Sequence, residues 1–228
     1  MSDYDAIAET FSAAVDSEPG NALYERPATI ALLPPLERLD VLDAGCGSGF
    51  YTEHAIKAGA RVVAFDPSGE MVKQAVKRVG DGCEIIHCPS SELAQRLGGR
   101  RFDLILSNLV LHYVWDLEAE AKYLADALKP DGRILVSMKH PLMNGAFITK
   151  NGFRATGPVE IEWRWAKAKV THVQRPLGAI ADAFFAAGLI IERLVEAYPD
   201  PAMETADPRG YRMAMFKPFF IHFILAKR

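Results

Sequence analysis

The chain has 228 residues, of which 50% are apolar and 24% are charged, and its formal net charge is −3. These values are typical of one globular domain with a full hydrophobic core, and they exclude a disordered chain or a strongly basic nucleic-acid- or membrane-binding protein. The N-terminus carries acidic residues and no apolar run, so it does not resemble a signal peptide, and no segment approaches the roughly 20 apolar residues of a membrane span. Three cysteines without metal-ligand spacing indicate reduced thiols, so we expect a cytoplasmic protein.

Short apolar runs alternate with helical patterns from residue 40 onward. Strands joined by helices of this length predict right-handed crossovers and a parallel sheet covered on both faces. In chain order, the pattern predicts a strand at 40–45, a helix at 50–60, a strand at 61–66, a helix at 68–79, a strand at 83–88, a helix at 90–98, a strand at 101–108, a helix at 117–128 and a strand at 132–138.

The alternation stops after the fifth strand, and no matching helix follows in residues 139–174. Within that segment, 159–166 alternates apolar and charged residues, which is typical of a half-buried antiparallel strand. A helix is expected at 176–188, followed by strands at 189–197 and 219–228 around a proline-rich loop.

No repeat or low-complexity linker divides the chain, so the sequence predicts one domain. Its first residues have a helical pattern and lie outside the sheet. The expected parts are an N-terminal helical cap (1–35), a ligand-binding half (36–140), an insertion after the fifth strand (141–174), and a C-terminal helix with strands (175–228).

The stretch VLDAGCGSGFYTEH places three glycines in five positions directly after an apolar run that contains Asp43. A dinucleotide fingerprint would require its third glycine at the position of Phe50, and a P-loop would require Gly-Lys-Ser/Thr after the turn. Neither pattern is present. A glycine turn with a carboxylate just upstream suits a ligand that carries an ammonium group and an adenosine. The glycines are Gly45, Gly47 and Gly49.

The segment VLDAGCGSG resembles motif I of the class I S-adenosylmethionine-dependent methyltransferases. VVAFDPSGEMVKQA is similar to motif II of that family, FDLILSNLVLHYV to motif IV, and LADALKPDGRILVSMKHP to the segment that leads into strand five. The resemblance runs from about residue 20 to the C-terminus. It implies a Rossmann-like α/β fold with a seven-stranded sheet in the order 3-2-1-4-5-7-6 and an antiparallel seventh strand. It also implies S-adenosylmethionine as cofactor and S-adenosylhomocysteine as product.

Cofactor-binding residues follow from this resemblance. Asp66 ends a strand beside the turn, where its carboxylate can accept hydrogen bonds from both ribose hydroxyls. Asp43 either orders the turn and the ligand's ammonium group or only holds backbone amides. Serines stand where relatives often carry an acidic residue for the adenine. The remaining expected contacts are Tyr24 and Arg26 in the cap, Gly45, Cys46 and Gly47 in the turn, Pro67 and Met71 after strand two, Ser90 and Ser91 after strand three, and Asn108 and Leu109 after strand four.

Two histidines follow strand ends on the side where such enzymes perform their chemistry. His112 or His140 could act as a general base because histidine titrates near neutral pH, and the alternative for each is a structural histidine. The insertion is the expected acceptor side. Its candidates are Phe147, Phe153, Trp163 and Trp165 for an apolar pocket, and Arg154, Arg164 and Arg175 for an anionic group.

Several activities are excluded or disfavoured by what the motifs lack. No N/D-P-P-Y motif follows strand four, which disfavours methylation of nucleobase amines or glutamine amides. Asn108 and Lys139 stand where metal-dependent relatives present acidic ligands, so no metal is expected. We therefore expect a monomeric or dimeric methyltransferase that modifies oxygen, nitrogen or carbon of a small metabolite, without nucleic-acid or membrane partners. The alternatives are an RNA or protein methyltransferase and a non-catalytic cofactor-binding module.

Overall fold

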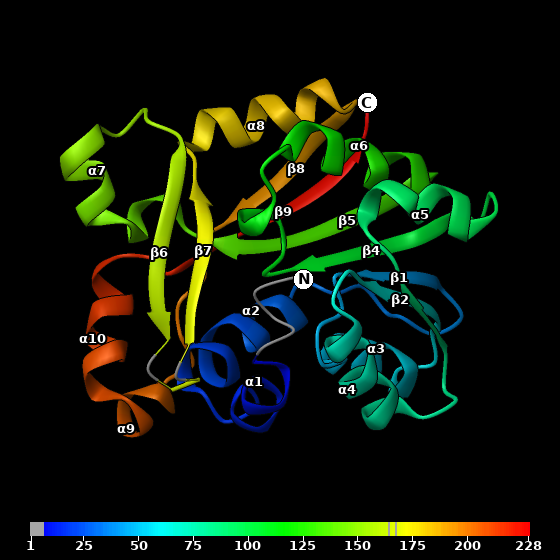
Figure 1. The fold of residues 1–228 in the computed structure, drawn as a ribbon, viewed down its shortest axis with the longest axis horizontal. Helices are drawn as coiled ribbons and strands as arrows, with labels where there is room; N and C mark the ends of the chain where they lie inside the picture. Colours follow the sequence, from blue (N-terminus) through cyan, green and yellow to red (C-terminus); the bar gives the residue numbers. More distant parts are fainter. Residues whose placement is uncertain (1–6, 164, 167) are drawn as a thin grey trace.

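The computed structural model describes residues 7–163, 165–166 and 168–228. Its main sheet has seven strands in the order β3-β2-β1-β4-β5-β9-β8 (Figure 1). The strands from β3 to β5 pair in parallel, whereas β9 is antiparallel to both β5 and β8. Because β8 and β9 are the sixth and seventh strands of this sheet, the expected strand order is confirmed. The strands are β1 (Asp40–Ala44), β2 (Arg61–Asp66), β3 (Glu84–His87), β4 (Phe102–Asn108), β5 (Leu128–Lys139), β8 (Leu189–Val195) and β9 (Phe220–Lys227).

Helices cover both faces of this sheet. The larger core lies on one face, where α5 (Ser90–Leu97), α6 (Leu117–Ala127) and α8 (Leu177–Ala186) pack on the strands. On the other face lie α3 (Phe50–Lys57) and α4 (Gly69–Val79). Because the sheet is covered on both sides, the central strand β4 buries three consecutive apolar residues, Leu104, Ile105 and Leu106, rather than alternating.

Residues 141–174 form more structure than the single strand expected there. After the short turn η3 (Pro141–Met143) comes a helix, α7 (Gly145–Asn151), and then an antiparallel hairpin of β6 (Gly157–Trp163) and β7 (Ala168–Gln174). The hairpin stands beside the main sheet as a separate two-stranded ribbon (Figure 1). The sequence indicated β6 through its alternation, but α7 and β7 were not predicted.

The expected proline-rich loop between β8 and β9 contains two helices, α9 (Met203–Ala206) and α10 (Pro208–Phe216). Pro208 occupies the first turn of α10, where its missing N–H removes no helical hydrogen bond. Asp207 caps the same helix by accepting a hydrogen bond from the Gly210 N–H at 2.9 Å. A proline that reads as a loop signal therefore starts a helix here.

The N-terminal segment is helical, as expected, over its described part. It consists of α1 (Ala8–Ala14), a π-helical turn η1 (Asn21–Glu25) and α2 (Arg26–Ile30). In Figure 1 this segment, in blue, lies below the sheet, with the helices α3 and α4 on one side of it and the β6–β7 hairpin on the other. Among the described residues, no helix is long and apolar enough to span a bilayer.

Candidate functional site

A cavity of about 410 Å³ lies at the carboxyl ends of β1, β2 and β4. Its far side is formed by the N-terminal segment and the β6–β7 hairpin. Ligands of open α/β sheets bind outside the carboxyl ends of the strands, and this volume lies in the range of small-molecule sites. Of the residues expected from the sequence, the cavity is lined by Arg26, Asp43, Gly45, Cys46, Gly47, Asp66, Pro67, Met71, Ser90, Asn108, Leu109, His112 and Trp163.

The turn after β1 has left-handed backbone at Gly45 and Gly47, and at Gly45 it also has no room for a side chain. Gly45 has φ +81°, and a Cβ built on it would lie 2.5 Å from Cγ2 of Val110, so a side chain has no room there. Gly47 has φ +52°, but a Cβ there would meet nothing within 4 Å. The backbone at Gly47 therefore faces the cavity without obstruction. The N–H groups of Gly45 and Cys46 both donate to the Phe65 carbonyl, at 2.9 and 3.0 Å, which fixes the turn against β2.

Asp66 ends β2 opposite this turn, and its carboxylate is buried. One carboxylate oxygen accepts the Gly47 N–H and the other accepts the Ser68 N–H, each at 2.8 Å. A carboxylate oxygen has two lone pairs, so one that accepts a backbone N–H can also accept a hydrogen bond from a ligand hydroxyl. The same residue thus orders the turn and presents a negative charge at the cavity wall, and its role toward a ribose stays a prediction.

Asp43 is buried beneath the turn, and its carboxylate accepts a hydrogen bond from the Thr52 hydroxyl at 2.6 Å. Burial raises the pKa of Asp43 to about 6, because the charged form is poorly solvated there, and the nearby negative charge of Asp66 adds to this effect. The two carboxylates make this end of the cavity favourable for a positively charged group.

Asn108 and Leu109 follow β4 on the opposite wall. The side-chain amide of Asn108 is buried, lines the cavity, and finds no hydrogen-bond partner for its oxygen or nitrogen among the described residues. Leu109 adopts a left-handed backbone conformation with φ 57°, and its N–H donates to the Ser137 carbonyl at 2.8 Å. An unpaired buried amide beside a strained backbone is an arrangement that proteins concentrate at ligand sites.

The two candidate histidines lie in different places. His112, in the turn η2 (Leu111–Tyr113), lines the cavity, and neither ring nitrogen has a hydrogen-bond partner among the described residues. Burial lowers the pKa of His112 well below its ordinary value, and the proximity of His172, Lys139 and Arg175 lowers it further. His112 is therefore a neutral, unpaired imidazole at the cavity wall.

His140 does not line the cavity, which corrects the expectation that it faces the acceptor. Its Nε2 contacts the Glu196 carboxylate at 2.7 Å, and its Nδ1 accepts the Leu142 N–H at 3.1 Å. Both ring nitrogens are therefore used within the fold. Because side chains alternate along a strand and its extension, His140 and Lys139 point to opposite sides of β5.

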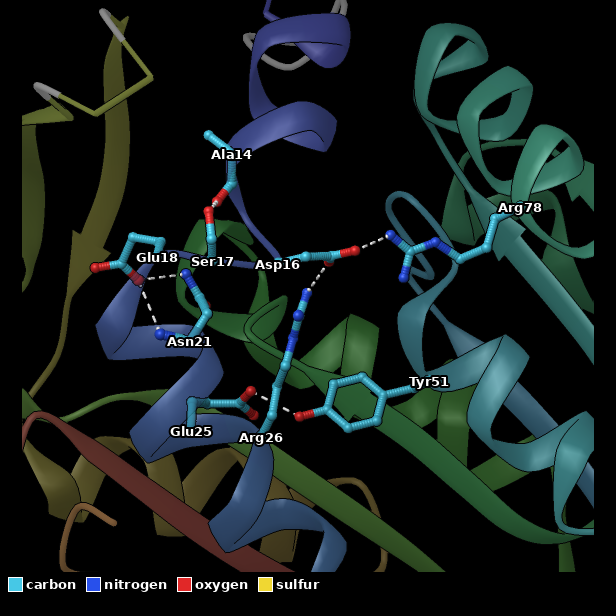
Figure 2. A network of polar contacts seen from close by, with 9 residues as sticks. All are labelled: Ala14, Asp16, Ser17, Glu18, Asn21, Glu25, Arg26, Tyr51 and Arg78. Atoms are coloured by element: carbon cyan, nitrogen blue, oxygen red, sulfur yellow. Dashed lines mark hydrogen bonds and ion pairs between the residues drawn. The ribbon is translucent and has the colours of Figure 1, made fainter. Parts of the chain in front are cut away.

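The N-terminal segment contributes Arg26 but not Tyr24 to the cavity. The Tyr24 side chain is fully buried away from it, and its hydroxyl donates to the Ala197 carbonyl at 2.8 Å, so the expected cofactor contact is wrong. The Arg26 guanidinium lies 3.7 Å from the centroid of the Phe50 ring. It also donates to Asp16 at 2.8 Å (Figure 2), so Arg26 is held at the cavity wall by neighbours on two sides.

Among the described residues, one of the acceptor-side candidates proposed from the insertion reaches the cavity. Trp163 lines it, whereas Trp165 packs behind, with its ring centroid 5.2 Å from that of Trp163. Phe147 packs at the start of β6 against Gly157. Arg175 holds the η2 turn by donating to the carbonyls of Val114 and Trp115.

Three further expected residues lie outside the cavity lining. Ser91 is exposed on α5, while its neighbour Ser90 lines the cavity. Phe153 and Arg154 are exposed and outside the cavity lining. Arg164 lies outside the described residues.

The residues of the cavity wall that were not predicted as site residues include Phe11, Glu25, Tyr113 and Lys139. Lys139 could have been found, because it follows Ser137 by two positions at a strand end and so shares its face. Phe11 and Glu25 could not, since only the docking of the N-terminal segment brings them to the sheet. Glu25 is buried and accepts hydrogen bonds from the hydroxyls of Tyr51 (Figure 2), Thr29 and Ser137.

Residues 42–136 match a family model described as a methyltransferase domain. This range runs from β1 into β5 and contains the glycine turn, Asp66 and Asn108, so the match covers the same wall of the cavity that the geometry identifies.

Individual relatives agree with this match. The ubiquinone biosynthesis O-methyltransferase of Rhizobium etli is 35% identical over 115 residues, which are 49% of this chain and 46% of the relative. The malonyl-[acyl-carrier protein] O-methyltransferase of Pseudescherichia vulneris is 35% identical over 133 residues, 57% of this chain and 51% of the relative. The chain spans about half the length of the curated relatives it matches. A crystal structure of an S-adenosylmethionine-dependent methyltransferase from Mesorhizobium loti superposes with a TM-score of 0.75 at 26% identity, covering 94% of this chain and 100% of that one.

Proposed function

Because the chain belongs to the class I S-adenosylmethionine-dependent methyltransferases, whose cofactor is S-adenosylmethionine, we propose that it transfers a methyl group to a small metabolite. The acceptor atom is an oxygen, a nitrogen or a carbon. The two curated relatives described above are named as O-methyltransferases, which favours oxygen. The modest cavity and the net charge of −3 favour a small molecule over RNA.

One arrangement carries this proposal: a glycine turn that faces the cavity without side chains, opposite a buried carboxylate. Gly47 leaves open space at its Cβ position, and its N–H is held by Asp66. On the other wall, the amide of Asn108 keeps two polar atoms without a protein partner in the described chain. These groups fit a ligand with ribose hydroxyls at one end and a charged amino-acid portion at the other.

Each part of the cofactor has residues suited to it. Asp66 would accept hydrogen bonds from the ribose hydroxyls. Met71 and Ser90 line the part of the cavity next to Asp66 and would contact the adenine. Asp43 and the glycine turn would hold the ammonium group, and the Arg26 guanidinium would attract the carboxylate.

S-adenosylmethionine supplies a methyl group bonded to a positively charged sulfur. Because this donor is already activated, the chain needs no covalent nucleophile, and its task is to orient the acceptor and exclude water. His112 suits that task, since a neutral imidazole can donate one hydrogen bond and accept another. Phe11 and Trp163 line the cavity with apolar surface.

Isothermal titration calorimetry with S-adenosylhomocysteine tests the cofactor site directly. We expect saturable binding of this ligand and none of NADH, because the turn lacks the third glycine of a dinucleotide site. A screen of metabolites with radiolabelled S-adenosylmethionine then tests transfer. Equal binding of both ligands, or binding of neither, contradicts the proposal.

A further inference from the structure

The Lys139 ammonium group at the end of β5 makes none of the proposed cofactor contacts. Lys139 follows Ser137 by two positions and therefore points to the same side of the strand, toward the cavity that it lines. No carboxylate of the described chain forms an ion pair with it. Its nearest aromatic partner is Phe220, whose ring centroid lies 5.2 Å from Nζ. A half-buried cation without a counter-ion is unfavourable unless a ligand completes its environment.

Glu25 is the carboxylate on the same side of the sheet, and it accepts three hydrogen bonds from hydroxyl groups. It accepts from the Tyr51 hydroxyl at 2.6 Å, from Thr29 at 2.9 Å and from Ser137 at 2.5 Å. Burial lowers the pKa of Lys139, while the charges of Glu25 and Glu18 counter this effect. Three hydroxyl donors therefore stabilise Glu25, and the Lys139 ammonium remains available to the cavity.

Besides Glu18 and Glu25, the polar groups near Lys139 are cationic or neutral. His112, His172 and Arg175 lie close enough for their charges to influence one another, and burial keeps both imidazoles neutral because it lowers their pKa values, that of His172 to about 4. Arg175 is the further fixed positive charge in this group. An anion at the cavity wall beside Lys139 would be attracted by its ammonium group and by Arg175, while the three hydroxyl donors to Glu25 reduce the repulsion from that carboxylate.

The cavity that Lys139 lines also has aromatic walls. Phe11 and Trp163 line the cavity with their rings stacked at 5.8 Å and 28°. Tyr113 lines it too, and its ring packs 4.2 Å from that of His112. Flat apolar side chains and a cation that line one cavity suit a planar ring that bears a negative oxygen.

We propose that Lys139 binds the anionic oxygen of an aromatic acceptor, either an ionised phenol or a ring carboxylate. This inference rests on the proposed function for the identity of the acceptor. Lys139 neutralises the acceptor's charge and fixes its orientation, and the aromatic side chains hold its ring.

The test uses 4-nitrophenol, because only its ionised form absorbs visible light. We expect the wild-type protein to bind the phenolate and raise its visible absorbance at a pH just below the phenol's own pKa. Lys139→Met should weaken binding about tenfold or more and abolish the absorbance change, since a hydrogen bond to a charged group is lost. Lys139→Arg should retain the change. Lys150→Met, at an exposed position of α7, is the matched control.

A parallel titration with 4-nitrobenzoate separates the two sources of the anion. If only 4-nitrophenol binding depends on Lys139, the anionic group of the acceptor is an ionised hydroxyl. If only 4-nitrobenzoate binding depends on Lys139, that group is a carboxylate. If binding of both probes is unchanged in Lys139→Met while its thermal melting matches wild type, the inference is wrong. The probes are titrated with and without S-adenosylhomocysteine. Failure of S-adenosylhomocysteine to bind would instead overturn the proposed function, and anion binding that depends on Lys139 would still support this site.

Discussion

Asp16 joins Arg78 of α4 to the N-terminal segment across 62 positions of the chain, with 2.5 Å between carboxylate and guanidinium. Its other carboxylate oxygen accepts from Arg26 at 2.8 Å (Figure 2). Burial raises the pKa of Asp16, but hydrogen bonds and charge from Arg26 and Arg78 outweigh it, so the pKa lies below its ordinary value. The Asp16 carboxylate thus binds both Arg26, which lines the cavity, and α4 through Arg78.

Asp16→Ala should loosen the N-terminal segment more than it destabilises the whole fold. Asp16 is half exposed, so its pairs are partly screened, and we expect affinity for S-adenosylhomocysteine to fall by about two- to fivefold. Hydrogen exchange should rise in α1 while the central strands stay protected. The exposed Asp131→Ala is the control. Unchanged exchange in α1 would show that the segment is held by its apolar contacts alone.

Asp66→Ala should weaken cofactor binding by about 2–3 kcal/mol, because hydrogen bonds to a charged group are worth about 1.5–3 kcal/mol. The structure adds a second effect: the N–H groups of Gly47 and Ser68 lose their acceptor, so the melting temperature should also fall. Calorimetry and thermal melting measure the two effects separately. An unchanged dissociation constant would mean that the ribose is held elsewhere.

Asp43→Asn should make the protein more stable at neutral pH and weaker at binding its cofactor. The folded-state pKa of Asp43, about 6, lies above its ordinary value of 3.8, so the protonated form stabilises the fold at low pH. That contribution, about 3 kcal/mol at most, is lost as pH rises from roughly 4 to 6. Urea unfolding should show that the free energy of unfolding of the wild type falls across this pH range. The variant should not show this fall, because its Asn side chain does not ionise. Parallel pH curves for the two proteins would contradict this account.

Gly45→Ala should destabilise the protein by about 2–4 kcal/mol, because it combines a left-handed backbone with overpacking against Val110. Gly98→Ala is the matched control: Gly98 has φ +59° at the end of α5, but a Cβ there would meet nothing within 4 Å. The control should cost only about 1–2 kcal/mol. Equal losses in urea unfolding would show that backbone strain alone explains both.

His112→Gln should lower methyl transfer by about 100-fold while leaving cofactor affinity unchanged, if His112 orients the acceptor or takes its proton. Because the pKa of His112 is well below 6.5, any inflection it causes in the pH–rate profile lies on the acid side of neutrality, and the variant should lack it. His140→Gln is the comparison, since His140 lies outside the cavity. A rate change confined to His140→Gln would reverse the assignment.

The strands and helices of the parallel sheet could be located from the sequence because each parallel strand is a continuous apolar run and each helix has its own periodicity, whereas the strand order was implied by the family resemblance. The glycine turn and Asp66 could also be located, since left-handed backbone and a carboxylate at a strand end are local requirements. Both α7 and α10 were missed because short helices carry weak periodic signals, and Pro208 serves as a helix start rather than as a loop residue.

The remainder of the site was decided by tertiary packing. His112 and His140 look alike in sequence, yet one reaches the cavity and the other pairs with Glu196, which lies 56 positions away. Local spacing determines where the chain turns, because a turn's backbone angles depend on a few adjacent residues. Which polar side chain meets the ligand depends on segments far apart in the chain: Phe11 and Glu25 join the cavity wall only because the N-terminal segment docks beside the sheet, where long-range burial and hydrogen bonds hold it.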